Sequence, residues 1–258
     1  MIKKLFIIAG ISTVVSVVAL AGAAALAGRE IGTKGYAVSL VKEGDGMRIR
    51  KGDKARVAPA TKTIAWTGGD AMTLDLPAKV EYVQGAESSI VITGPQALID
   101  AVKVDGSRLW TMDTDRQPET VNFVIGPDGF EAKSDREGLK IVITAPSVTS
   151  FTLIGNGDLE LHNYDQPKLV VDMSGSGDLE GSGQTKALKI TQSGSGEADL
   201  DNLRTDDADI QLSGSGSTKV RAFGKANVDI SGSGNVELAT KPATLLSHIA
   251  GSGSLDQD

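Results

Sequence analysis

A four-residue phrase of the form x-Gly-x-Gly recurs at six regularly spaced positions in the C-terminal half of the chain, and it constrains the fold more than any other feature. Its first glycines are 20, 19, 20, 18 and 19 residues apart, a regularity typical of stacked structural units and not of a flexible linker. The phrases contain these glycines: Gly155, Gly157, Gly175, Gly177, Gly194, Gly196, Gly214, Gly216, Gly232, Gly234, Gly251 and Gly253.

The residues beside each phrase alternate between apolar and polar. Alignment of the six copies on their glycines gives three largely apolar columns: the first two are two residues apart before the phrase, and the third lies two residues after the second glycine. This period predicts a half-buried strand on each side of the phrase, whereas a helix would be interrupted by every Gly-x-Gly. The columns are Phe151, Val171, Ile190, Ile210, Val228, Ser247; Leu153, Met173, Gln192, Leu212, Ile230, Ile249; and Leu159, Leu179, Ala198, Thr218, Val236, Leu255.

These patterns predict an all-β fold, a right-handed parallel β-helix (β-solenoid) with about six rungs over residues 151–258. The twelve glycines are expected at the corners, where positive φ and close backbone approach are needed. Rungs about 4.8 Å apart would stack the serines of the phrase into a ladder. The right hand follows from the chirality that governs parallel crossovers.

Residues 63–150 are expected to form an irregular β N-terminal part of the solenoid domain. Short alternating runs are separated by glycine-containing turns, and Pro95 to Val102 is the one stretch with a helical pattern. Trp66, Tyr82 and Trp110 lie in or beside these runs and would serve either as core residues or as a sugar-binding set. The runs are Thr63–Trp66, Ala71–Leu76, Lys79–Val83, Ser88–Thr93, Ala101–Val104, Arg108–Met112, Val121–Ile125 and Leu139–Thr144.

The N-terminus predicts export. Met1 to Lys4 is basic, Leu5 to Gly28 carries no charge, and Ala25-Leu26-Ala27 is a small-x-small cleavage site. Residues 1–28 therefore form a cleaved signal peptide or a retained N-terminal anchor, and the folded part is expected in the periplasm or at the cell envelope or surface of a bacterium. The chain contains no cysteine, which excludes disulfides, thiolate metal sites and lipoprotein processing.

Residues 29–62 read as a basic linker, with nine Lys or Arg and four Asp or Glu. Such a segment could contact anionic lipid or polysaccharide. It could equally be a solvated linker or dock on its own chain, because the residues that follow are acidic.

The chain resembles the bacterial exported domains of the family called putative auto-transporter adhesin, head GIN domain. The resemblance is carried by Ile64 to Gly68, Val80 to Gly85, Leu139 to Pro146 and the Ser-Gly-Ser-Gly rungs, and it spans about residues 63–257. It implies a parallel β-helix and a role at the cell surface. It supplies no catalytic residues.

Acidic residues follow the first three regular corners in two columns. Asp158, Asp178 and Glu197 form one column and Glu160, Glu180 and Asp199 the other, whereas later copies carry Ser217, Lys219 or Asn235. The alternatives are a solvated acidic face and a calcium site. We assign no metal ligand, because calcium-binding rolls repeat every nine residues and hold their ligands in the turn.

Other candidates for chemistry are weak. Asp206, Asp207 and Asp209 alternate in a strand and mark a turn, and His162 and His248 have no partner motif. Gly-x-Gly without a strand-to-helix context is not a phosphate loop. An acidic chain without a basic, aromatic face argues against nucleic acid. No catalytic residue and no cofactor are predicted.

The function predicted from the sequence is a non-enzymatic, exported β-solenoid that binds or scaffolds something at the cell envelope, in the manner of an adhesin. The partner is envelope polysaccharide, protein or a second copy of the chain, and membrane contact is expected only through an uncleaved N-terminal segment. Self-association would use the last rung, which ends at Leu255 to Asp258. The alternative is a cation-dependent module or a degenerate carbohydrate-active solenoid.

Overall fold

The computed structural model describes residues 36–43, 46–51, 59–112, 119–126, 129–134 and 139–257. The chain divides into two compact units, one of residues 1–56 and 118–135 and the other of residues 57–117 and 136–258. The expected signal or anchor at residues 1–28 lies outside the described residues. No helix within the described ranges has the length and hydropathy that crossing a membrane requires.

The first unit is a four-stranded antiparallel sheet in the order β10-β9-β1-β2. Strands β1 and β2 lie within residues 29–62, the segment that the sequence predicts as a basic linker. The run at Val121–Ile125 is a strand, but it belongs to this sheet and not to the solenoid. The strands are β1 Tyr36–Glu43, β2 Gly46–Lys51, β9 Glu119–Gly126 and β10 Gly129–Ser134.

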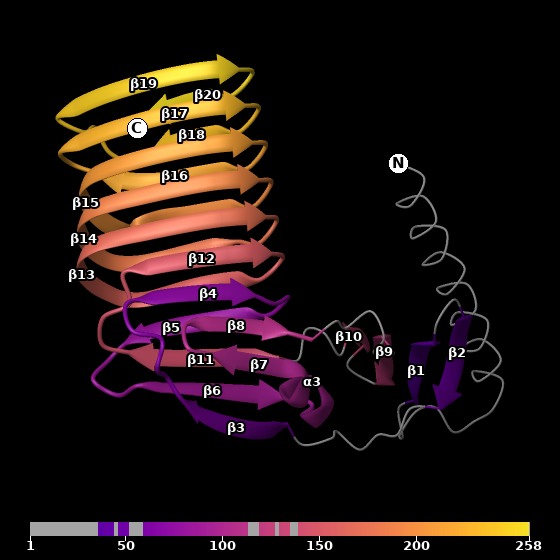
Figure 1. The fold of residues 1–258 in the computed structure, drawn as a ribbon. Coiled ribbons are helices and arrows are strands. Elements are labelled where there is room, and N and C mark those ends of the chain that lie inside the picture. Colours follow the sequence, from indigo (N-terminus) through magenta and orange to yellow (C-terminus); the bar gives the residue numbers. More distant parts are fainter. Residues whose placement is uncertain are drawn as a thin grey trace. The chain divides into compact units, whose positions relative to one another are not determined.

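The second unit is a parallel β-solenoid of about five turns (Figure 1), which confirms the predicted fold class. Its longest strands start after one corner phrase and run, bending, to the next. Each of them pairs in parallel with the strands of the neighbouring coils. The strands are β12 Ser150–Gly155, β13 Asp158–Gly175, β14 Leu179–Gly194, β15 Glu197–Gly214, β16 Ser217–Ala222, β17 Lys225–Gly232, β18 Asn235–Leu238, β19 Thr244–Gly251 and β20 Ser254–Gln257.

From β12 to β18 the apolar columns of the sequence face the inside of the coils and are buried. Phe151, Val171, Ile190 and Ile210 are fully buried, and each lies in register with the next along the stack. Burying such a side chain stabilises the fold by about 1.5–3 kcal/mol. The period-two pattern therefore becomes a continuous hydrophobic interior.

The N-terminal part of the solenoid is irregular. Strand β4 pairs in parallel with β12, and β5 pairs in parallel with both β13 and β11. Antiparallel pairs β11–β6, β6–β3 and β7–β8 complete this end. The elements are β3 Ala60–Ala65, β4 Ala71–Asp75, β5 Lys79–Gln84, β6 Ser89–Gly94, α3 Gln96–Ala101, β7 Val102–Asp105, β8 Arg108–Thr111 and β11 Lys140–Ala145.

Three aromatic rings join the irregular part to the regular coils. The Tyr82 and Phe151 ring centroids are 5.2 Å apart, and the Tyr164 centroid lies 6.4 Å from each of them. All three side chains are buried. Tyr82 donates a hydrogen bond of 2.9 Å to the carbonyl of Ala145, so the hydroxyl remains paired inside the core.

Candidate functional site

The first glycine of each phrase forms one column along the stack. Gly155, Gly175 and Gly194 lie in register, and the column continues through Gly214, Gly232 and Gly251. All six have φ between 87° and 142°, a region that side-chain-bearing residues rarely adopt. The residue between the two glycines donates its N–H to the first glycine of the preceding coil, as Ser195 does to Gly175 at 2.9 Å.

The second glycine of each phrase has a different requirement. These residues do not have positive φ, but a Cβ atom on Gly177, Gly196 or Gly253 would lie nearer than 3.0 Å to the carbonyl oxygen of the second glycine one coil before. Gly157 meets the carbonyl of Leu76 in the same way. Close stacking of the coils therefore excludes a side chain at the second glycine of the phrase.

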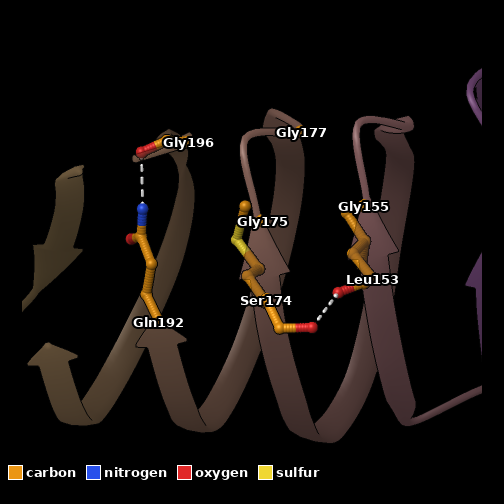
Figure 2. A pocket seen from close by; sticks show the side chains of 8 residues that line it. Leu153, Gly155, Ser174, Gly175, Gly177, Gln192 and Gly196 are labelled. Carbon is orange, nitrogen blue, oxygen red and sulfur yellow. Dashed lines mark hydrogen bonds between the residues drawn. The ribbon is translucent and has the colours of Figure 1, made fainter. Parts of the chain in front are cut away.

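Figure 2 shows the space behind three of these corners. Ser174 Oγ donates to the carbonyl of Leu153 at 3.4 Å, and Gln192 Nε2 donates to the carbonyl of Gly196 at 2.5 Å. The space between the side chains does not admit a water-sized molecule. These corners hold the backbone together and leave no room there for a ligand.

The acidic residues predicted after the corners do form ladders. Glu160, Glu180 and Asp199 lie in register on adjacent coils, and Lys219 occupies the next position. In the neighbouring column, Asp158 Oδ1 accepts the N–H of Asp178 at 3.1 Å. Asp178 Oδ1 accepts the N–H of Glu197 at 2.9 Å. Carboxylates of that column thus bond to the backbone of the following coil.

Basic side chains compensate part of this charge. Glu160 lies 2.5 Å from Lys79 Nζ and 3.5 Å from His162 Nε2, and Lys219 lies 3.0 Å from Glu237. The Glu160 carboxylate raises the pKa of the Lys79 ammonium above its usual value through a hydrogen bond and charge attraction. Within the described residues, no three His, Asp or Glu side chains group closely enough to hold a metal ion.

The structure does not bring the other polar candidates together. His162 lies beside Glu160, whereas His248 is exposed on β19. Asp207 Oδ1 accepts the N–H of Lys225 at 2.8 Å, and Asp209 Oδ1 accepts from Asn227 Nδ2 at 3.0 Å. These two aspartates therefore bond to the adjacent coil.

The aromatic set also separates. Trp66 and Tyr82 belong to the core. Trp110 is half-buried, and the Arg108 guanidinium lies 5.4 Å from its ring centroid. These three rings therefore do not form a common sugar-binding surface.

A hollow that the sequence analysis did not anticipate lies where β13, β14 and β15 bend. It has a volume of about 460 Å³. We call it the bend hollow, and it is lined by Asp165, Gln166, Pro167, Gln184, Thr185, Lys186, Arg204 and Asp206.

A column of polar side chains runs through the bend hollow and continues beyond it to Arg221. Asp165 is in register with Gln184, Gln184 with Arg204, and Arg204 with Arg221. These residues follow the second glycine of their phrases by eight, seven, eight and five positions, so an alignment on the glycines does not superimpose them. The residues that precede the first three of them, Tyr164, Gly183 and Leu203, also lie in register with one another, so an alignment on these residues would have shown that part of the column.

Stacked parallel coils with stacked glycine corners define the chain as a β-solenoid. The family model described as "Putative auto-transporter adhesin, head GIN domain" matches residues 70–242, and the chain belongs to this family.

The fold is shared with one solved structure, and two further structures are similar at lower TM-scores. A putative adhesin from Bacteroides fragilis is similar with a TM-score of 0.59 and 16% identity, over 80% of this chain and 100% of that one. A putative lipid binding protein from Parabacteroides distasonis has a TM-score of 0.44 and 19% identity, over 79% and 98% of the two chains. A putative adhesin from Parabacteroides merdae has a TM-score of 0.43 and 17% identity, over 79% and 97%. Among curated proteins the chain has no match.

Proposed function

We propose that the chain is an exported, non-enzymatic, adhesin-like module that binds an extended partner at the bacterial cell envelope. The observation that carries this proposal is the register of the coils, which places outward side chains in columns across several coils at spacings of about 4.8 Å. Such columns can contact a polymer at several points, and the combined contacts increase its affinity.

The adhesin family and the fold support this proposal, as does the charged N-terminus with its uncharged run at Leu5–Gly28. The family and the similar structures are named as adhesins or as lipid-binding, and these names describe no enzyme. The Asp158 and Asp178 carboxylates accept backbone N–H groups, which is a structural use.

The test is a binding screen of the exported chain against isolated bacterial envelopes and purified envelope polysaccharides, with and without a calcium chelator. We expect saturable binding that survives chelation and leaves the polymer length unchanged. Binding that disappears with the chelator, or shortening of the polymer, would replace this proposal with the cation-dependent or carbohydrate-active alternative. No binding to any envelope fraction would overturn it.

A further inference from the structure

The bend hollow is polar and open, and its size falls within the range of about 300–1,000 Å³ that is usual for small-ligand sites. Its floor includes the buried Thr185, and its walls are the exposed side chains of Asp165, Gln184, Lys186 and Arg204. Because it spans β13, β14 and β15, a ligand lying along it would cross consecutive coils.

Hydrogen bonds hold one end of the hollow in place. Gln84 and Asp165 bond reciprocally: the Gln84 Nε2 donates to the carbonyl of Asp165 at 3.0 Å, and the N–H of Asp165 donates to Gln84 Oε1 at 2.8 Å. Gln184 Nε2 donates to Asp165 Oδ1 at 3.1 Å. The Gln184 amide is therefore fixed in an exposed position, where its oxygen and its second N–H can meet hydroxyl groups of a ligand.

Beside the β15 side of the hollow the column continues from Arg204 to a second arginine, Arg221, although the chain has a net charge of −7. Arg204 and Arg221 are exposed and occupy the same register position on adjacent strands, where like charges repel. Asp206 Oδ1 lies 3.8 Å from Arg204 and compensates one of these charges. A ligand carboxylate placed here would relieve the repulsion and accept paired hydrogen bonds from a guanidinium.

An exposed aromatic ring lies beside Arg204. Phe223 keeps 38% of its surface accessible, and the Arg204 guanidinium lies 4.2 Å from its ring centroid. Stacking on the ring holds the guanidinium and leaves apolar surface next to the hollow. Aromatic surface next to hydrogen-bonding groups suits the apolar faces and the hydroxyl groups of a sugar.

We propose that the bend hollow, together with Arg221 beside it, binds an acidic polysaccharide, with uronate carboxylates on Arg204 and Arg221 and sugar hydroxyls on Gln184 and Asp165. This proposal rests on the proposed function and names its ligand class. An extended glycan advances per sugar unit by a length similar to the strand spacing, so successive units can meet successive coils. The shallow polar lining has no deep apolar cavity for a lipid tail and no open sheet edge for a peptide.

The test uses the exported chain and oligogalacturonate as the acidic probe, with a neutral galactan of the same length for comparison. In Arg204→Ala/Arg221→Ala we expect affinity for oligogalacturonate to fall roughly tenfold or more, because two charge-assisted contacts are lost. The matched control is Lys62→Ala/Lys103→Ala, which removes the same charge from β3 and β7 and should leave affinity unchanged. Phe223→Ala should weaken binding to a smaller extent.

Arg204→Lys tests whether binding needs the paired donors of a guanidinium or only a positive charge, because lysine keeps the charge and loses the paired donors. Thermal melting of each variant identifies loss of folding. Equal affinities of wild type and the double arginine variant for the acidic probe would overturn the site, as would a preference for neutral galactan or for anionic phospholipid vesicles. If the double arginine variant still binds envelopes like wild type, the hollow is not the binding site and the proposed function stands. If wild type binds no envelope fraction, the proposed function itself fails.

Discussion

The regular coils from β13 to β20 and the irregular part from β3 to β8 both turn the chain at corners around a buried interior, but their corners differ in sequence. In the regular coils each corner is stacked on a corner with the same backbone, and glycine is required at two positions of every coil. In the irregular part the corner next to Gly157 is Leu76-Pro77-Ala78, which contains no glycine, and buried aromatic rings with paired hydroxyls join this part to the regular coils. A repeat is therefore needed only where a coil stacks on a similar coil.

The two parts also differ at their ends. At the N-terminal end, β3 pairs with β6 and α3 buries Ile99 against the core. In the last described coil β19 pairs with β17 alone, and Leu246 and Ile249 are 50% and 42% exposed. Antiparallel strands and a helix thus cover one end, whereas the other presents the same backbone edge as every coil before it.

The largest expected effect comes from a pair of glycine substitutions at the boundary between the two parts. Gly175 has φ 131° and a Cβ there would lie within 3.0 Å of the carbonyl of Gly155, whereas Gly155 has φ 87° and no atom near the position of a Cβ. Gly175→Ala should destabilise the solenoid by more than about 4 kcal/mol, because strain and overlap add. Gly155→Ala should cost about 1–2 kcal/mol from its φ alone.

Urea unfolding of both variants measures this difference, with Gly69→Ala as a control, since Gly69 has φ 66° in an open turn. Equal losses in Gly175→Ala and Gly155→Ala would show that backbone conformation, and not stacking, makes the corners depend on glycine.

The regular coils could be predicted because their constraint repeats. Six copies allow columns to be compared, so Phe151, Val171 and Ile190 identify the interior and the glycines identify the corners. Even the irregular strands were located, because alternation and turn residues are local signals. Each predicted run between Thr63 and Thr144 overlaps an observed strand.

What the sequence did not reveal depends on contacts between distant segments. The run at Val121 reads as a strand, but nothing in it indicates that its partner is β1 at Tyr36–Glu43. The bend hollow was missed because Gln184 and Arg204 follow their corners by different numbers of residues, so that only the three-dimensional register aligns them. Such pairings depend on where the strands shift register to fit coils of different length. An alignment of the sequence copies does not contain that information.

The second prediction concerns the hydroxyls of the aromatic junction. Tyr164 Oη lies 2.8 Å from the carbonyl of Lys168 and 3.1 Å from that of Val148, and its proton is shared between them. Tyr164→Phe keeps the ring and leaves these acceptors without their donor, which should reduce the free energy of unfolding at neutral pH by about 1–3 kcal/mol.

The same residue should lower the free energy of unfolding of the solenoid at alkaline pH. Burial raises the pKa of Tyr164, with a further contribution from Tyr82, and burial also raises the pKa of Tyr82. Above pH of about 10 an unfolded chain ionises its tyrosines while the folded chain keeps these two protonated, so stability falls as pH rises. In unfolding curves from pH 8 to 11, Tyr164→Phe should lose less stability than wild type over this range. A parallel decline in both proteins would contradict the assignment to Tyr164.

The smallest effect is expected inside the regular coils, at the one column position where an amide replaces an apolar side chain. Gln192 is buried, its Nε2 donates to the carbonyl of Gly196, and its Oε1 accepts the Thr218 hydroxyl at 2.6 Å. Gln192→Leu restores an apolar column but leaves that hydroxyl unpaired, and we expect a loss of about 1 kcal/mol. The carbonyl of Gly196 keeps a second donor in the N–H of Ser217.

Gln192→Leu/Thr218→Val removes both partners and should return the urea midpoint to that of wild type or above it, because no polar group then remains buried without a bond. Thr218→Val alone is the matched single variant, and it should cost less than Gln192→Leu because the amide of Gln192 retains its bond to Gly196. The double variant could instead be the least stable of the three. That result would show that the Gln192 bond to Gly196 stabilises the corner, so that the regular coils depend on side-chain hydrogen bonds as the aromatic junction does.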